Sequence, residues 1–172
     1  MLITTTEAQK IAVCFHEDRK TAERYILNFK SLEKNYEEQK EAYVNYTDSD
    51  SNVGGGRGGV GNPTEKQALK NLEFDNLSQS ACWLKAVTMC RASLGERKNI
   101  FINCRIEADT RAFRNGDRGR KAWVVYTQRR YAEEIEKRFL TCEYVSEKTA
   151  KNWWKEIVDR VVYIANKIKP SD

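Results

Sequence analysis

A long stretch with helical periodicity, Glu7–Tyr46, constrains the fold more than any other feature of the sequence. Its apolar residues recur every three or four positions, which places them on one side of a helix. The series is Ala8, Ile11, Phe15, Ala22, Tyr25, Phe29, Leu32, Tyr36 and Tyr43. A helix of this length would span about 60 Å and could not bury its stripe alone. We therefore expect it to fold back on another helix of the chain, or to pair with a second copy as a homodimer.

A glycine-rich segment follows this first helix. Six of the chain's nine glycines lie at positions 54, 55, 56, 58, 59 and 61. Their spacing matches the Gly-x-Gly-x-x-Gly loop that binds dinucleotides, but such a loop needs a preceding strand, and residues 46–52 are polar and turn-forming. The Gly-Lys-Ser/Thr of a P-loop is absent. The segment is therefore predicted to be a flexible linker, in which the role of Arg57 stays open.

A second helix is expected to begin directly after the linker. Asn62 is a suitable N-cap, Pro63 suits the first helical position, and Glu65 suits a capping box. The helix is predicted to run to about Leu94, with Gly95 as its C-cap. Its apolar stripe consists of Leu69, Leu72, Leu77, Ala81, Leu84 and Val87. Two long helices joined by a glycine linker favour a helical hairpin.

The charge of the chain is unevenly distributed. The net charge is +5, but residues 1–50 carry 7 Lys and Arg against 10 Asp and Glu, while residues 51–172 carry 23 against 15. Residues 105–130 are the most basic part, with eight Lys and Arg against three Asp and Glu. A basic C-terminal part beside an acidic first helix indicates that one portion meets a polyanion. The side chains expected to hold nucleic-acid phosphates are Arg111, Arg114, Arg118, Arg120, Lys121, Arg129 and Arg130.

The C-terminal part has the order of a helix-turn-helix. A short amphipathic helix is predicted over 131–139, followed by a turn and by Ser146 as the cap of a second helix. The predicted buried face of that second helix comprises Ala150, Trp153, Ile157, Val161 and Ile164. Its solvent face would enter the major groove of DNA. The residues expected to read bases are Ser146, Lys148, Thr149, Lys151, Asn152 and Lys155. A simple helical hairpin that ends a bundle is the alternative.

These features predict an all-α fold, with a long N-terminal helical hairpin and a C-terminal helix-turn-helix. The expected units are a long helix over 1–46, which can form a coiled coil, the linker over 47–62, a second helix over 63–98, a basic insertion or connector over 99–128, and the DNA-binding region over 129–172.

Two stretches of the chain resemble the RinA/ArpU type of phage-encoded transcriptional regulators. They are NVGGGRGGVGNPTEKQAL (52–69) and YAEEIEKRFLTCEYVSEKTAKNWWKEIV (131–158). The resemblance implies a regulator of late phage genes in Gram-positive hosts, with a C-terminal helix-turn-helix similar to sigma-factor region four. It also implies that Ser146–Lys155 is the DNA-reading helix. There are two departures. The family's recognition helix tends to be richer in Arg and Lys, whereas Glu147 and Trp154 stand here, and Asn99–Lys121 looks like an insertion.

Several functional classes find little support in the sequence. The five cysteines are scattered without a Cys-x-x-Cys pair, and there is one histidine, so we expect no metal centre, cofactor or disulfide framework. No nucleophile lies beside a plausible base, and the protein is not expected to be an enzyme. No apolar stretch is long enough for a membrane span, and no secretion signal is visible, which favours the cytoplasm of a bacterial host.

The expected partner is double-stranded DNA, and RNA polymerase is a further candidate partner for a regulator. Two alternative functions stay open. One is a DNA-packaging protein like a phage small terminase subunit, which also joins a helix-turn-helix to oligomerising helices. The other is an interaction protein whose long helix binds a host protein such as RNA polymerase.

Overall fold

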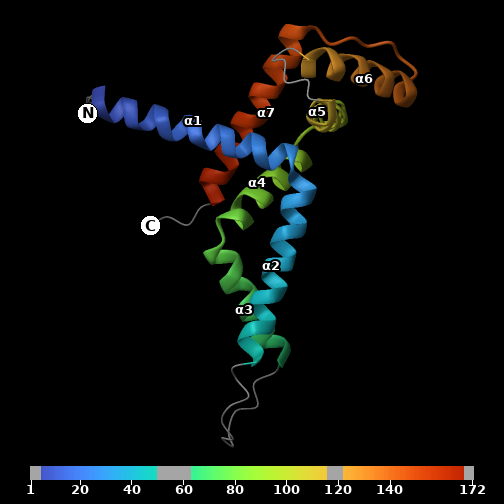
Figure 1. The fold of residues 1–172 in the computed structure, drawn as a ribbon. Helices are drawn as coiled ribbons and strands as arrows, with labels where there is room; N and C mark the ends of the chain where they lie inside the picture. The colour runs from blue at the N-terminus through green and yellow to red at the C-terminus, as the bar shows by residue number, and fades with distance from the viewer. Residues whose placement is uncertain (1–4, 50–62, 116–121, 169–172) are drawn as a thin grey trace, which may run out of the picture.

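The computed structural model describes residues 5–49, 63–115 and 122–168, and within them the regular structure is entirely helical (Figure 1). The all-α prediction is therefore confirmed. The seven helices of these residues are α1 (Thr5–Leu27), α2 (Phe29–Ser49), α3 (Pro63–Leu77), α4 (Gln79–Ser93), α5 (Glu96–Asn115), α6 (Ala122–Phe139) and α7 (Glu147–Ile168). The glycine run at 54–61 and the proposed cap Asn62 lie outside the described residues.

The first helical stretch is bent in the middle rather than straight. In place of one helix over 7–46, α1 ends at Leu27 and α2 begins at Phe29, and the chain turns sharply between them (Figure 1). Asn28 lies at the bend, where its side-chain amide donates to the Arg24 carbonyl at 3.1 Å, the same carbonyl that its backbone N–H contacts at 3.0 Å. An asparagine amide that competes for backbone partners weakens a helix at that point.

The second helical stretch is interrupted as well. It begins at Pro63 as predicted, but α3 ends at Leu77, and α4 runs from Gln79 to Ser93 instead of continuing α3. Ser78 between them is extended, with φ −91° and ψ 113°. At the end of α4 the cap position is taken by Leu94 and not by Gly95.

The predicted hairpin exists, with α2 and α3 as its arms. These helices lie side by side and extend away from the rest of the molecule (Figure 1), and we call them the α2–α3 limb. Phe74 of α3 packs between Tyr36 and Tyr43 of α2, with ring centroids 5.5 and 5.3 Å apart. Lys40 of α2 and Asp75 of α3 form an ion pair at 2.7 Å across the limb. The first helical stretch was expected to fold back on another helix of the chain, and α2 does so by packing against α3.

The segment expected to be a basic insertion or connector, 99–128, is largely structural. Most of it belongs to α5 and to the first turns of α6, and these two helices pack closely on one another. Phe101 is almost fully buried and meets Tyr131 of α6 and Trp153 of α7 edge-on, at centroid distances of 6.4 and 5.5 Å. Helix α6 also begins at Ala122, well before the start expected near Tyr131.

Helix α7 packs against three other helices, α4, α1 and α6, and in Figure 1 it passes behind α1. Its inward face agrees with the prediction for three residues, because Ala150, Ile157 and Val161 are buried; Trp153 and Ile164 are half-buried. The inward face also includes residues that were not predicted, namely Trp154, Val158, Val162 and Ala165.

Candidate nucleic-acid interface

The start of α7 is fixed by Ser146, as predicted from the sequence. The Ser146 hydroxyl oxygen accepts a hydrogen bond from the backbone N–H of Thr149 at 3.1 Å and lies 2.8 Å from the Thr149 hydroxyl. This is the geometry of an N-cap, in which a side-chain oxygen satisfies a free N–H of the first turn. The hydroxyls of Ser146 and Thr149 are therefore engaged with each other.

The first turns of α7 present a polar stripe to solvent. Lys148, Lys151, Asn152 and Lys155 are all exposed, and their spacing of three and four residues places them on one side of the helix. Lys151 forms an ion pair with Glu147 one turn earlier, with its ammonium nitrogen 2.5 Å from the carboxylate. Four of the six residues predicted to read bases thus share one accessible surface, which we call the α7 stripe.

Trp154 does not belong to the α7 stripe, although it falls within the segment expected to be the reading helix. It is buried, and its indole N–H donates to the Glu23 carboxylate of α1 at 3.0 Å. Its position shows why a tryptophan stands there: it joins the inward side of α7 to α1.

The connection between α6 and α7 is longer than the short turn of a helix-turn-helix. It occupies residues 140–146 and runs back along α6 (Figure 1), whereas turns of three or four residues are typical of that motif. Val145 is buried, and its carbonyl accepts a hydrogen bond from the buried Gln128 amide at 2.7 Å. Arg97 holds Glu143 at 3.3 Å. These contacts anchor the connection to α5 and α6.

A second part of the site is a notch of about 300 Å³ between α5 and α6. It brings together three of the arginines predicted to hold phosphates, and two carboxylates and a tyrosine that were not predicted. The lining residues are Arg111, Arg129, Arg130, Glu107, Glu133 and Tyr126. We call this the α5–α6 notch.

The carboxylates of the notch are largely committed to Arg130. Its guanidinium contacts Glu133 at 2.6 Å, Glu107 at 3.2 Å and Glu134 at 3.4 Å. The hydrogen bonds from Glu133 and then Glu107 raise the pKa of Arg130 above its ordinary value. The charge of Arg130 is therefore balanced within the fold.

The other two arginines of the notch are more open to solvent. The Arg129 side chain is 80% exposed, although it touches Glu133 at 3.0 Å. Arg111 is exposed and lies over the ring of Tyr126, 5.1 Å from its centroid. The Tyr126 hydroxyl in turn donates to Glu107 at 2.6 Å, and this hydrogen bond, followed by those from Arg130, lowers the pKa of Glu107. Arg129 and Arg111 are thus the arginines of the notch that an incoming phosphate can reach.

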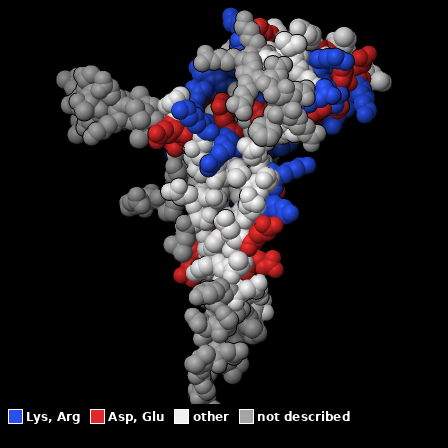
Figure 2. Space-filling view, in the orientation of Figure 1, with Lys and Arg blue, Asp and Glu red and all other residues white. Residues whose placement is uncertain are grey.

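The remaining predicted phosphate contacts are not placed. Arg118, Arg120 and Lys121 lie outside the described residues, and so does the side chain of Arg114, which belongs to α5. Figure 2 shows basic side chains gathered in the upper part of the molecule, where α5, α6 and the start of α7 lie, with acidic side chains among them.

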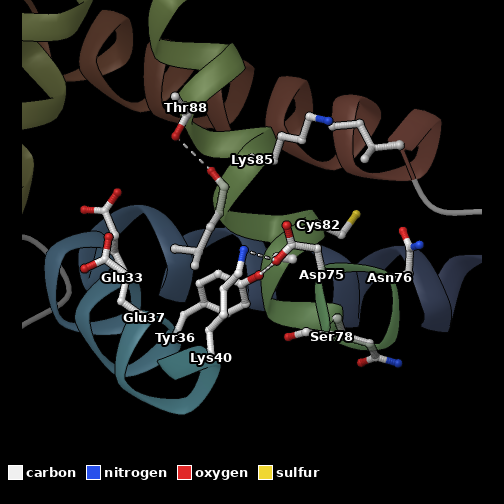
Figure 3. A pocket seen from close by; sticks show the side chains of 14 residues that line it. Glu33, Tyr36, Glu37, Lys40, Asp75, Asn76, Ser78, Cys82, Lys85 and Thr88 are labelled. Atoms are coloured by element: carbon white, nitrogen blue, oxygen red, sulfur yellow. Dashed lines mark hydrogen bonds and ion pairs between the residues drawn. The ribbon is translucent and has the colours of Figure 1, made fainter. Parts of the chain in front are cut away.

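A larger groove of about 780 Å³ lies elsewhere, between the α2–α3 limb and α4 (Figure 3). Asp75 projects into it and accepts hydrogen bonds from Lys40 and from the Tyr36 hydroxyl. Burial raises the pKa of Asp75, but these two hydrogen bonds, with the charges of Lys40 and Lys85, outweigh burial and lower it. Burial and the bond to Asp75 raise the pKa of Tyr36. This network joins α2 to α3, whose residues Tyr36 and Asp75 are 39 positions apart in the sequence, which is why no local sequence pattern indicated it.

No described helix combines the length and apolar character that crossing a bilayer requires. The described side chains also include no group of three His, Cys, Asp or Glu residues arranged to hold a metal ion. In comparisons with known proteins, no protein-family model, no curated protein and no solved structure matches this chain.

Proposed function

We propose that this protein is a sequence-specific DNA-binding transcriptional regulator of late genes in a phage or mobile element. The observation that carries the proposal is the α7 stripe, in which three lysines and an asparagine project from one side of a capped helix whose other side is buried. Lysine and asparagine are side chains that hydrogen-bond base edges in the major groove. The resemblance to phage regulators supports the assignment to late genes.

The α5–α6 notch supplies the second kind of contact that DNA recognition needs. Phosphate contacts provide most of the affinity and fix the orientation of the protein, while base contacts provide specificity. Arg129 and Arg111 would hold phosphates beside the groove that the α7 stripe enters. In this role the protein works in the cytoplasm of the bacterial host, with RNA polymerase as a protein partner.

Charge reversal on the α7 stripe tests the proposal. Full-length protein is first used to select bound duplexes from a random-sequence pool, and the selected duplex is then used in gel-shift assays. The double variant Lys151→Glu/Lys155→Glu should lose binding and keep the wild-type circular dichroism spectrum and melting temperature.

The matched control is Lys30→Glu/Lys34→Glu on α2. It has the same charge change and the same four-residue spacing, and Lys34 pairs with Glu38 as Lys151 pairs with Glu147. This control should bind like the wild type. Undiminished binding by the α7 variant, or an equal loss in the control, would reject the α7 stripe as the DNA-reading surface.

A further inference from the structure

Tyr144, in the connection between α6 and α7, is a large aromatic side chain that the fold leaves open to solvent. It is 70% exposed, whereas Glu143 before it is half-buried and Val145 after it is buried. No hydrogen bond joins the Tyr144 hydroxyl to another described residue. The connection is therefore enclosed on both sides of Tyr144 and open at Tyr144 itself, which leaves this phenol available to a partner.

The backbone around Tyr144 is fixed by the residues on either side of it. Arg97 of α5 holds Glu143 at 3.3 Å, and the Val145 carbonyl accepts a hydrogen bond from the Gln128 amide of α6 at 2.7 Å. A single exposed apolar side chain is ordinary on a protein surface, but one on an anchored segment loses little conformational entropy when it binds. Tyrosine adds to this advantage, because only two torsions describe its side chain.

Tyr144 lies at the beginning of the α7 stripe. It comes two residues before the cap Ser146 and four before Lys148, the first residue of the stripe. Four residues of chain span at most about 14 Å, and the major groove is about 12 Å wide. With Lys148 in the groove, Tyr144 therefore stands within about one groove width of it, near the sugar–phosphate strand that borders the groove. Tyrosine hydroxyls are among the groups that donate to DNA phosphates.

We propose that Tyr144 is a phosphate-contacting residue of the DNA interface, whose hydroxyl donates to a backbone phosphate beside the groove that the α7 stripe enters. This inference rests on the proposed function and adds a contact of a different kind from those of Arg129 and Arg111. A phenol carries no charge at neutral pH, so its contact releases no counterion from the DNA. Tyr144 therefore adds affinity and fixes the orientation of α7 without adding to the salt dependence of binding.

Gel-shift titrations of the full-length protein at several salt concentrations test the inference, with the duplex selected from a random-sequence pool. Tyr144→Phe removes only the hydroxyl and should weaken binding about fivefold, the effect of one neutral hydrogen bond. Its slope of log K against log salt should equal that of the wild type. Tyr144→Ala also removes the ring and should weaken binding by about tenfold or more. Both variants should keep the wild-type melting temperature, because the side chain is largely exposed.

The matched control is Tyr163→Phe, which removes the hydroxyl of a 64% exposed tyrosine in the C-terminal half of α7. This control should bind like the wild type. Wild-type affinity of Tyr144→Phe, an equal loss in the control, or a shallower salt slope of Tyr144→Phe would overturn the inference. The proposed function would still stand if the wild type binds its duplex and Lys151→Glu/Lys155→Glu does not. A wild type that selects no duplex would instead reject the proposed function and this contact together.

Nitration with tetranitromethane gives an independent readout of the contact. In the free protein the reagent should modify both Tyr144 and Tyr163, since both are exposed. In the complex with the selected duplex, Tyr144 should be protected and Tyr163 should react as before, as measured by mass spectrometry of proteolytic peptides. Equal nitration of Tyr144 with and without DNA would count against the contact.

Discussion

Arg105 of α5 and Trp154 of α7 are in direct contact in the interior, with the guanidinium carbon 5.0 Å from the centroid of the indole ring. Trp123 of α6 lies 4.5 Å from the same guanidinium, so that a cation occupies the angle between two indoles. Burial lowers the pKa of Arg105, which the charge of Asp109 and its hydrogen bond partly offset. A cation over aromatic faces is held by the ring quadrupoles, and this cluster ties three helices together.

Replacing Arg105 should therefore destabilise the fold. We expect Arg105→Ala to lower the free energy of unfolding by about 3 kcal/mol, because it removes two cation–π contacts and leaves a cavity. Trp154→Phe should lose about 1–2 kcal/mol with the hydrogen bond to Glu23. Urea unfolding of both single variants and the double variant forms a double-mutant cycle. Strictly additive effects would contradict a direct energetic coupling between the two side chains.

At Tyr131, by contrast, a substitution should stabilise the folded protein. Its side chain is fully buried, and its hydroxyl has no hydrogen-bond partner among the described residues. An unsatisfied buried hydroxyl is unfavourable, so Tyr131→Phe should raise the free energy of unfolding by about 1 kcal/mol. A lower stability of the variant at neutral pH would show that the hydroxyl has a partner, such as a bound water.

The same substitution should change the alkaline pH dependence. Burial, followed by the charge of Glu143, raises the pKa of Tyr131 from 10.0 to about 12 in the folded protein. Between these values the unfolded chain loses the phenol proton while the folded chain keeps it, so wild-type stability falls as the pH rises above 10. A phenylalanine has no phenol proton to lose, so the Tyr131→Phe variant should not show this decline. Chemical denaturation should therefore show the difference between the variant and the wild type widening from pH 10 upward.

Leu140 is a second position where a substitution should stabilise the protein. It follows the end of α6 with φ 54°, in the left-handed region, and its side chain is 90% exposed. Its backbone N–H donates to the Glu136 carbonyl at 2.9 Å, which is the pattern of a helix C-cap that favours glycine. Leu140→Gly should raise the free energy of unfolding by about 1 kcal/mol. Leu140→Ala, which keeps a Cβ, is the control and should change stability little.

The two neighbouring arginines of α6 should behave differently. Arg129→Ala should leave stability within about 0.5 kcal/mol of wild type, because its pair with Glu133 is exposed. If Arg129 holds a phosphate, this variant should weaken DNA binding and reduce the slope of log K against log salt by about 0.9. Arg130→Ala should instead lower stability by about 1 kcal/mol, since it removes the arginine that three partly exposed carboxylates share. Thermal melts and salt-dependent binding curves separate these roles, and a reversed pattern would contradict the assignment.

The lowered pKa of Asp75 predicts that the stability of the protein depends on pH in the acidic range. Its pKa in the folded protein lies below the ordinary value of 3.8, so the stability it contributes is present above that value and is lost as the pH falls through the folded-state pKa. Asp75→Asn should be less stable than wild type at pH 7 by about 1 kcal/mol at most, because the ion pair with Lys40 is partly exposed. The difference should shrink below about pH 4. A difference that stays constant down to about pH 2 would exclude the ion pair as its cause.

The helices themselves were largely predictable from sequence, because apolar spacing and capping residues are local. Ser146 was identified as a cap from its own segment, and the start of α3 at Pro63 from the residues around it. The interruptions at Asn28 and Ser78 were not predicted, since a single polar residue within a periodic stretch does not distinguish a bend from a continuous helix. The burial of α5 was missed for a related reason. Its run of Ile100, Phe101 and Ile102 is apolar on several sides, which suits a helix enclosed by neighbours rather than an amphipathic one.

The candidate site, too, could be predicted from the sequence only in part. The α7 stripe lies within one helix, and periodicity alone placed its lysines together. The carboxylates that surround Arg130 come partly from another helix, since Glu107 is 23 residues away in the sequence. Which arginines keep a free charge therefore depended on how α5 packs against α6, and no local pattern contains that information.

The packing of α7 against α1, α4 and α6 has a mechanical consequence. One side of this helix is buried against these helices, and the other carries the α7 stripe. A regulator that reads DNA with a tethered module can reorient that module while its body stays still, but here the α7 stripe and the buried face belong to the same helix. Under the proposed function, the protein must dock as a unit, and distant changes in the contacts of α1 or α4 with α7 would alter the angle at which the lysines approach the groove.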